Sequence, residues 1–228
     1  MNNANIYQPI KARLLEVIEE SPTIKTFVLQ PEQKFSFHTG QFIELILEGV
    51  GEAPFTPSSS PLVKEKLDIT VMKTGYVTQR LHQLKGGETL GIRGPYGRGY
   101  PLEKLYDKEV LVMGGGCGFA PLRSLLYNLQ AEQERIKKVT FCYGSKSPRE
   151  CIYEPYIEEL RSFPKFEVMR TVDEADESWT EEVGVATVLL DKVEVNISNS
   201  VSVVVGPPII MKFSVQKLLE MGYPEDKF

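Results

Sequence analysis

The chain has 228 residues, of which 42% are hydrophobic and 25% are charged, a composition that is ordinary for a globular protein and excludes extended disorder. At about 100 to 200 residues per domain, this length predicts one large or two small domains. The formal net charge of -5 lacks the basic excess that binding to a phosphate backbone needs, so we expect no nucleic-acid partner.

The cysteines and the N-terminus bear on the compartment. Cys117, Cys142 and Cys151 fit no disulfide framework and no zinc or iron–sulfur spacing, so we predict no metal site. The first five residues are polar, and no apolar run approaches the ~18 residues of a membrane span. The sequence therefore predicts a cytoplasmic protein without a membrane span.

The first part of the chain, residues 1–104, has the pattern of antiparallel β-structure. Short segments rich in β-branched and aromatic residues are separated by Gly, Pro and Ser clusters. The glycines leave room for one short helix, at 78–84. We predict a small antiparallel β-barrel or sandwich whose strands include 13–18, 23–29, 41–47, 67–73 and 88–93.

The second part, residues 105–228, alternates apolar runs with amphipathic stretches, which is typical of βαβ units on a doubly wound parallel sheet. The predicted strands are 109–113, 138–143, 166–171 and 200–205, and the predicted helices are 122–130, 153–163 and 210–221. The acidic segment 172–182, which contains Trp179, is expected to be a long surface loop.

The most specific local signal is the glycine turn at 114–118, between a predicted strand and a predicted helix. Glycines let a backbone approach a pyrophosphate, and a helix N-terminus offers free N–H groups to the anion. A tight turn alone would also favour glycine, but four glycines in five positions exceed what one turn requires. The turn therefore favours a dinucleotide, although its spacing is not that of the common G-x-G-x-x-G fingerprint.

Three weaker segments leave alternatives open. Residues 74–78 could hold a second pyrophosphate, but a Thr78 N-cap after a glycine turn is more often only a cap. In the segment 53–61, Phe55 could stack on a planar ring while the hydroxyl groups bind its polar atoms, and a solvated Ser/Pro turn is equally compatible. Residues 206–208 could border a ligand at the end of a parallel strand or form only a rigid turn.

Other chemistry has no anchor in the sequence. There is no G-x-S-x-G, H-E-x-x-H or paired-cysteine motif. His38 and His82 lack partners at ligand spacing, so both are predicted to be structural. What remains is the binding of two phosphate-bearing cofactors, one on each domain.

The order of these segments resembles the ferredoxin reductase family, in which a flavin-binding β-barrel precedes a nicotinamide-binding domain. Residues 53–56, 75–78 and 94–97 occupy the family's Arg-x-Tyr-Ser/Thr, Gly-x-x-Ser/Thr and Gly-Pro-x-Gly motifs, and 114–121 and 206–208 match its nicotinamide-nucleotide motifs. The branch that looks most similar contains the flavoprotein component of anaerobic sulfite reductase, the sulfhydrogenase gamma subunit and the dihydroorotate dehydrogenase electron-transfer subunit.

The resemblance implies FAD and NAD(P)H as cofactors, hydride transfer to flavin N5, and single-electron transfer to or from an iron–sulfur catalytic or electron-carrier subunit. It places Thr56 near N5 as the catalytic residue. The implied flavin contacts are Phe55, Thr56, Pro57, Ser58, Val71, Lys73, Gly75, Tyr76, Val77 and Thr78; the implied nucleotide contacts are Gly115, Gly116, Gly118, Ala120, Pro121, Tyr143, Gly144, Ser145, Lys146, Gly206, Pro207 and Pro208.

This sequence departs from the family pattern at four points. The motif arginine is Ala53, so its charge must come from elsewhere, with Lys73 a candidate; the motif tyrosine is Phe55; and the cysteine often found before Gly-Pro is Val205. Relatives continue into a Cys-rich tail that holds a two-iron two-sulfur cluster, whose ligands are absent here. Either the chain is cut or electrons leave by another route.

Two rival functions and the choice of nicotinamide follow from the same residues. A stand-alone flavin reductase or oxidase, or a flavin-free assembly subunit that keeps the fold, are the alternatives; the two intact glycine turns argue against the latter. Residues 144–149 contain no acid that would repel a 2'-phosphate, and Lys146 and Arg149 could attract one. We therefore expect both NADH and NADPH to reduce the flavin.

Overall fold

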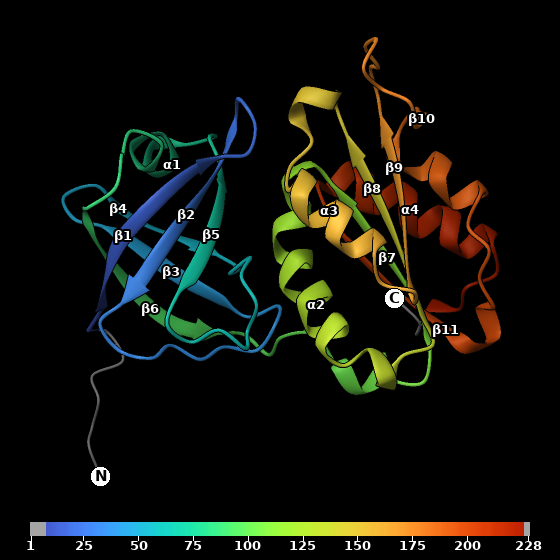
Figure 1. The fold of residues 1–228 in the computed structure, drawn as a ribbon, viewed down its shortest axis with the longest axis horizontal. Helices are drawn as coiled ribbons and strands as arrows, with labels where there is room; N and C mark the ends of the chain where they lie inside the picture. Colours follow the sequence, from blue (N-terminus) through green and yellow to red (C-terminus); the bar gives the residue numbers. More distant parts are fainter. Residues whose placement is uncertain (1–7, 226–228) are drawn as a thin grey trace. The chain divides into compact units, whose positions relative to one another are not determined.

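The structure is a computed structural model that describes residues 8–225. It divides into two compact units, one formed mainly by the chain up to Tyr100 and the other mainly by the chain from Pro101 onward (Figure 1). Each unit has its own sheet and its own buried core.

The first unit is built on a six-stranded antiparallel sheet. Its strands follow the order β4-β3-β6-β1-β2-β5, so β4 and β5 are the two edges. The antiparallel class expected for this half is confirmed. The elements are β1 (Ile10–Glu19), β2 (Ile24–Pro31), β3 (Phe42–Leu47), β4 (Gly51–Phe55), β5 (Leu67–Met72), α1 (Tyr76–Leu81) and β6 (Thr89–Tyr96).

Alternating side chains explain this sheet. On β1, Ala12 and Leu14 are fully buried whereas their neighbours Lys11 and Arg13 are exposed, as expected for a strand with one face on a core. A bulge between Leu14 and Glu16 interrupts the pairing with β2. The core also contains Phe27, Leu29, Phe35, Phe37, Ile43, Leu45, Leu67, Ile69, Val71, Leu81, Leu90 and Ile92.

Two local predictions for this unit need correction. The helix expected at 78–84 begins at Tyr76 and ends at Leu81, and its N-cap is Gly75 rather than Thr78. Strand β4 (Gly51–Phe55) includes residues 53–55, the first part of the segment 53–61 that suggested a turn or a ring contact. The proline at position 54 is compatible with a strand here because β4 lies at the sheet edge.

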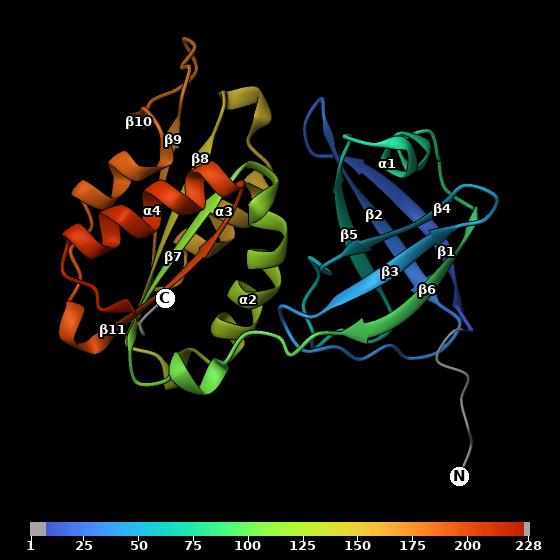
Figure 2. The same cartoon turned by 180° about the vertical axis from the view of Figure 1, so that it is seen from behind.

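The second unit is a five-stranded parallel sheet in the order β10-β9-β8-β7-β11. Helices α2 and α3 lie on one face and α4 on the other (Figure 2), which confirms the doubly wound class. The elements are η1 (Leu102–Lys104), β7 (Glu109–Gly115), η2 (Gly116–Gly118), α2 (Phe119–Ala131), η3 (Gln133–Arg135), β8 (Lys138–Ser145), η4 (Pro148–Glu150), α3 (Glu154–Arg161), β9 (Phe166–Val172), β10 (Glu182–Val183), η5 (Ala186–Asp191), η6 (Ile197–Asn199), β11 (Ser200–Val205) and α4 (Pro208–Glu220).

The parallel register sets where ligands can bind. Gly115 of β7 lies opposite Gly144 of β8, Ser145 of β8 lies opposite Val172 of β9, and Val205 of β11 lies opposite Gly114. The carboxyl ends of these strands therefore meet at one edge of the sheet, which is where open α/β sheets place their ligands. None of the helices in the described part of the chain is long and apolar enough to cross a membrane.

Candidate functional site

In the first unit, the segments assigned to a flavin lie on the two sheet edges and on α1. β4 continues into Thr56–Ser58 on one edge, while Val71 and Lys73 belong to or follow β5 on the other. The backbone N–H of Ser58 donates to the carbonyl of Asp68 over 2.8 Å, which links the two edges at this point. Edge strands present backbone polar groups that a planar, hydrogen-bonding ring can use.

The turn before α1 has room for a phosphate group. No described atom lies within 4 Å of the position that a Cβ on Gly75 would take, and first-turn N–H groups have no partner within their own helix. The Thr78 hydroxyl accepts hydrogen bonds from the N–H groups of Thr74 (2.9 Å) and Gly75 (2.8 Å) and donates to the Gly75 carbonyl. Thr78 therefore shapes the turn, and the backbone of Tyr76 and Val77 is better placed to hold a phosphate.

Several side chains expected to contact the flavin point into the protein. Val71 is fully buried in the core, and Pro57 and Ser58 are buried as well. The Ser58 hydroxyl is 2.9 Å from the Thr70 hydroxyl. Phe55 is half-buried, lies opposite Ile43 and packs against the core, whereas Thr56 is partly exposed. Any contact from Ser58 or Val71 would therefore be made by backbone atoms.

Two arginine side chains that the sequence motifs did not indicate lie near the candidate flavin segments. The Arg80 guanidinium lies 5.4 Å from the centre of the Tyr76 ring, one turn beyond Gly75. Arg93 of β6 reaches β4, where it forms a 2.6 Å ion pair with Glu52 beside the motif position Ala53. With the exposed Lys73, these side chains are candidates for the positive charge that Ala53 lacks.

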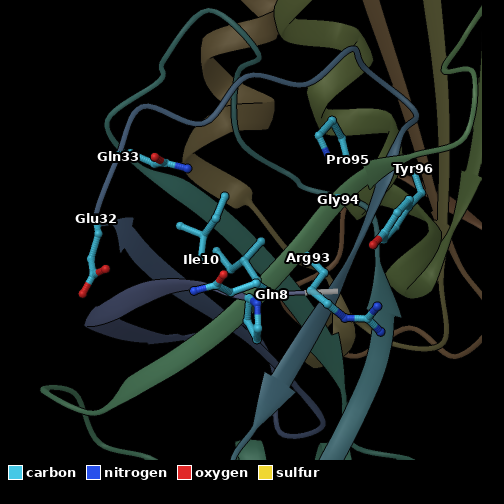
Figure 3. A pocket seen from close by; sticks show the side chains of 10 residues that line it. Gln8, Ile10, Glu32, Gln33, Arg93, Gly94, Pro95 and Tyr96 are labelled. Carbon is cyan, nitrogen blue, oxygen red and sulfur yellow. The ribbon is translucent and has the colours of Figure 1, made fainter. Parts of the chain in front are cut away.

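A pocket of about 690 Å³ lies elsewhere in this unit, where β1 begins and β6 ends (Figure 3). Ile10, Ile92, Arg93 and Tyr96 contribute to its lining. None of the ten residues assigned to the flavin by the resemblance lines this pocket, whereas Arg93 and the first three residues of the 94–97 motif do.

In the second unit, three glycines of the 114–118 turn have close neighbours where a Cβ would lie, and for Gly118 these neighbours are backbone atoms. A Cβ on Gly114 would lie 2.7 Å from Leu122, one on Gly115 would collide with Ile210, and one on Gly118 would lie 2.8 Å from the Val205 carbonyl oxygen. The abundance of glycine therefore does not by itself indicate a ligand. Only Gly116 in this turn combines a positive φ, +53°, with open space around its Cβ position.

Gly116 consequently marks the place where a diphosphate fits. It is the first residue of η2, and η2 leads into the first turn of α2, which contains Ala120 and Pro121. The close approach of Gly118 to Val205 and Gly206 brings this turn against the carboxyl end of β11. The two segments predicted to bind the nicotinamide nucleotide, 114–121 and 206–208, are thus neighbours, with Pro207 and Pro208 exposed.

At the end of β8, the side chains expected to contact the nucleotide point mostly into the protein. Tyr143 is fully buried, its ring lies 4.9 Å from that of Phe119, and its hydroxyl accepts a 3.4 Å hydrogen bond from the N–H of Ile152. Burial also raises the pKa of Tyr143. Its side chain therefore belongs to the core. Gly144 packs against Ala186, and the buried Ser145 hydroxyl donates to the Ser147 carbonyl.

Lys146 is exposed at the end of β8, and two acids lie beside it. The N–H of Asp173 donates to the Ser145 carbonyl (3.0 Å), and the N–H of Glu174 donates to the Lys146 carbonyl (2.9 Å). Burial, together with the charge of Glu174, raises the pKa of Asp173, while Lys146 opposes this shift. The sequence alone predicted a surface loop for these two acids and gave no reason to count them as candidate site residues; the signal was an acidic pair one residue beyond the predicted strand 166–171.

The side chains that could ligate a metal are scattered in the part of the chain that the structure describes. Within residues 8–225, no group of three or more His, Cys, Asp or Glu side chains is placed to hold an ion. Cys142 and Cys151 are buried, and Cys117 is partly exposed in the nucleotide turn. The open turns at Gly75 and Gly116 fit phosphate groups instead.

Comparison with known proteins assigns a cofactor type to each unit. Residues 11–100 match the oxidoreductase FAD-binding domain, and residues 112–216 match the oxidoreductase NAD-binding domain. The gamma subunits of sulfhydrogenases 1 and 2 from Pyrococcus furiosus are 29% and 31% identical to this chain; the matches cover 100% and 96% of this chain and 81% of each subunit. A probable dihydroorotate dehydrogenase B (NAD(+)) electron transfer subunit from Methanocaldococcus jannaschii is 37% identical over 67% of this chain and 54% of that protein.

The fold has close structural counterparts. The crystal structure of a ferredoxin NADP+ reductase from Neisseria gonorrhoeae, with bound FAD and NADP, superimposes with a TM-score of 0.81 at 21% identity over 94% of this chain and 92% of that one. Fold and sequence together define a two-domain oxidoreductase with an FAD-binding domain followed by an NAD-binding domain. The chain belongs to the ferredoxin reductase superfamily.

Proposed function

We propose that this chain is the flavoprotein electron-transfer subunit of a larger enzyme, in which NAD(P)H bound by residues 105–228 exchanges a hydride with FAD bound by residues 1–104. The observation that carries the proposal is that each unit contains one glycine turn open to a phosphate, at Gly75 and at Gly116, next to the start of a helix. The matches of this chain to an FAD-binding domain and then an NAD-binding domain support the proposal.

The residues of the first unit would bind and orient the flavin. The backbone of Tyr76 and Val77 holds the diphosphate, with Lys73 or Arg80 supplying positive charge. Phe55 borders the ring, and the partly exposed hydroxyl of Thr56 lies nearest the reacting atoms. When bound, the flavin supplies the chemistry that converts a two-electron hydride donor into a source of single electrons.

The residues of the second unit would bind the nicotinamide nucleotide. Backbone N–H groups of η2 hold the diphosphate at Gly116, and Gly206 and Pro207 border the nicotinamide end. Asp173 and Glu174 border the adenine ribose beside Ser145 and Lys146. Because a carboxylate accepts a bond from a ribose 2'-hydroxyl but repels a 2'-phosphate, the acids support a preference for NADH, which the residues 144–149 alone did not indicate.

The electron acceptor or donor would be an iron–sulfur subunit. Two sulfhydrogenase gamma subunits and an electron transfer subunit of dihydroorotate dehydrogenase B are among the relatives. Each of these proteins is named as one subunit of a larger enzyme. A partner of this kind accounts for the use of a flavin, which can deliver electrons one at a time to a one-electron centre.

An anaerobic titration tests the proposal. The purified chain is saturated with FAD, excess cofactor is removed, and the flavin absorbance is followed while NADH or NADPH is added. We expect one FAD per chain, full bleaching with about one equivalent of NADH, and a weaker response to NADPH. Failure to bind FAD at micromolar concentrations would favour a flavin-free assembly subunit, and fast turnover with oxygen or free flavin alone would favour a stand-alone reductase.

A further inference from the structure

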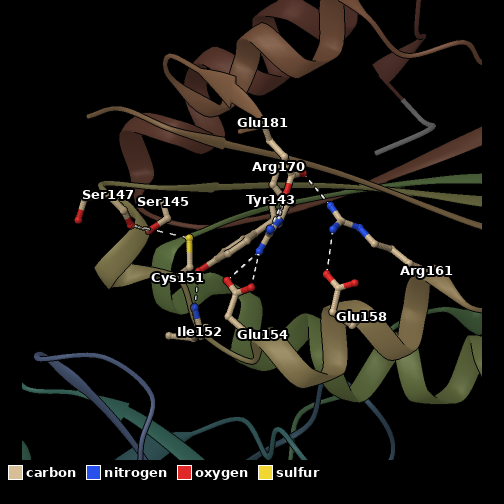
Figure 4. Close-up of polar contacts among 10 residues, drawn as sticks. All are labelled: Tyr143, Ser145, Ser147, Cys151, Ile152, Glu154, Glu158, Arg161, Arg170 and Glu181. Atoms are coloured by element: carbon tan, nitrogen blue, oxygen red, sulfur yellow. Dashed lines mark hydrogen bonds and ion pairs between the residues drawn. The ribbon is translucent and has the colours of Figure 1, made fainter. Parts of the chain in front are cut away.

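Arg170, in the middle of β9, is a buried cation with carboxylates on two sides (Figure 4). Its side chain is only 10% exposed. One terminal nitrogen contacts both oxygens of Glu154 at 2.7 and 2.6 Å, while its Nε contacts Glu181 at 2.7 Å and its other terminal nitrogen contacts the same oxygen of Glu181. Burial works to lower the pKa of Arg170, but the hydrogen bonds to Glu181 and Glu154 outweigh it and raise the pKa.

The two carboxylates belong to different parts of the second unit. Glu154 is the first residue of α3, and its side chain is 51% exposed. Glu181 ends the acidic loop between β9 and β10, and its side chain is 25% exposed. Arg161 of α3 adds a second cation to Glu181 at 2.7 Å. The contact to Glu181 is therefore the more buried of the two, and two arginines share it.

The same loop is held at its other end by the strand that carries the proposed ribose contacts. Asp173 and Glu174 donate their backbone N–H groups to the carbonyls of Ser145 and Lys146. Near the end anchored by Glu181, the Arg170 guanidinium lies 5.0 Å from the centre of the Trp179 ring, and the indole N–H donates to the Glu182 carbonyl over 2.7 Å. The loop that carries the two acids is thus tied down at both ends.

We propose that Arg170 and Glu181 form a clamp that positions the acidic loop, residues 173–181, for recognition of the adenine ribose. Arg170 and Glu181 are positioning residues, because they act on Asp173 and Glu174 through the loop and the strand. The inference rests on the proposed binding of a nicotinamide nucleotide by this unit, and it adds that affinity for the ribose depends on a buried ion pair outside the ribose contacts.

The two carboxylate contacts of Arg170 allow an effect on the loop to be distinguished from a general loss of stability. The Glu181 contact restrains the loop, whereas the Glu154 contact ties β9 to α3 and does not touch the loop. Removing either carboxylate takes one partner from the same buried arginine. Only the loss of Glu181 should free the loop, so Glu154→Ala is a matched control for Glu181→Ala.

The test measures binding of ADP-ribose, the half of NADH that carries the adenine ribose, by titration calorimetry on the full FAD-loaded chain. We expect Glu181→Ala to weaken ADP-ribose binding roughly tenfold, the cost of ordering one or two loop side chains on binding. Glu154→Ala should stay within about twofold of the wild type, although both variants melt at lower temperature. Arg170→Lys keeps the positive charge but loses the planar guanidinium that contacts both carboxylates, so its affinity for ADP-ribose should lie between those of the wild type and Glu181→Ala.

Kinetics provide a second readout. In NADH-dependent flavin reduction, Glu181→Ala should raise the apparent KM for NADH and leave kcat unchanged, because the residue does not touch the reacting atoms. If the wild-type chain binds ADP-ribose, the nucleotide site stands. In that case, equal losses of ADP-ribose affinity in the two glutamate variants, or unchanged ADP-ribose binding in Glu181→Ala, would overturn the clamp alone. Failure of the wild-type chain to bind ADP-ribose would instead overturn the nucleotide site and the clamp with it.

Discussion

Gly116 offers the sharpest test of the nucleotide turn, because it alone among the turn's glycines faces open space. A valine at this position would place its side chain where the diphosphate fits, and its Cβ would have no atom within 4 Å apart from those of Gly116 and its two chain neighbours. The cost to folding is the left-handed backbone, φ +53°, which for a side chain other than glycine is about 1 to 2 kcal/mol. Gly116→Val should therefore fold with reduced stability and an intact first unit.

The loss of nucleotide affinity should be at least comparable in size to that folding cost, and it is measured separately. Hydrogen bonds to charged groups contribute about 1.5 to 3 kcal/mol each, so displacement of the diphosphate from one or two backbone N–H groups predicts NADH affinity at least ~10-fold to ~100-fold weaker. Gly118→Ala is the contrasting variant. Its Cβ would lie 2.8 Å from the Val205 carbonyl oxygen and 2.9 Å from the Gly206 Cα, so it should lose more thermal stability.

Two measurements decide the matter. Stopped-flow reduction by NADH reports nucleotide binding, and the flavin absorbance of the purified protein reports the FAD unit. We expect Gly116→Val to retain FAD and to lose reduction at NADH concentrations that saturate the wild type. Normal reduction by NADH would show that the diphosphate does not lie at Gly116, and loss of FAD from the folded variant would show that the two cofactors do not bind to separate units.

Three further predictions concern specificity and pH. Asp173→Ser should raise kcat/KM for NADPH by about tenfold or more, because it removes a charge that repels the 2'-phosphate; an unchanged NADH to NADPH ratio would remove Asp173 from the ribose site. Lys146→Glu should weaken NADPH much more than NADH, because the new carboxylate opposes only the phosphate, and equal losses in kcat/KM would mean that Lys146 does not face the ribose. The third rests on His82, whose Nε2 lies 2.9 Å from the Val71 carbonyl oxygen and whose pKa is lowered from 6.5, mainly by burial. Because the unfolded chain binds the proton more readily, the contribution of His82 to stability is largest above pH 6.5 and falls as the pH drops toward the lower folded-state pKa. The variant His82→Gln keeps an N–H donor and cannot titrate. In thermal melts, its melting temperature should therefore fall less between neutral and acid pH than that of the wild type.

The sequence by itself was enough to predict both fold classes and a phosphate-bearing cofactor on each half, and its resemblance to a known family gave the order of the two cofactors. Strand and helix periodicities are local, and the glycine turns follow strands directly, so neither depends on knowing what lies opposite. Leu111, Val112 and Met113 are apolar because a central parallel strand is covered on both faces, and that pattern can be recognised without coordinates. The prediction that a glycine turn and then a helix follow a strand in each half was of the same local kind.

Which atoms face a ligand was decided by the tertiary structure. Four glycines in the 114–118 turn look alike in sequence, yet Gly118 lies against the backbone of Val205, Gly114 and Gly115 lie against the side chains of Leu122 and Ile210, and only Gly116 faces open space. Tyr143 lies near the carboxyl end of a strand, as a binding residue would, but its ring packs against that of Phe119.

The ribose site shows the same limit most clearly. Asp173 lies far along the chain from Lys146, and only the parallel pairing of β8 with β9 brings the ends of the two strands together. A strand's periodicity determines which of its faces is buried, whereas its neighbours in the sheet depend on the strand order of the whole domain. The sequence alone therefore indicated a nucleotide with no preferred form, and the acid on which we base the proposed preference for NADH became apparent only from the fold.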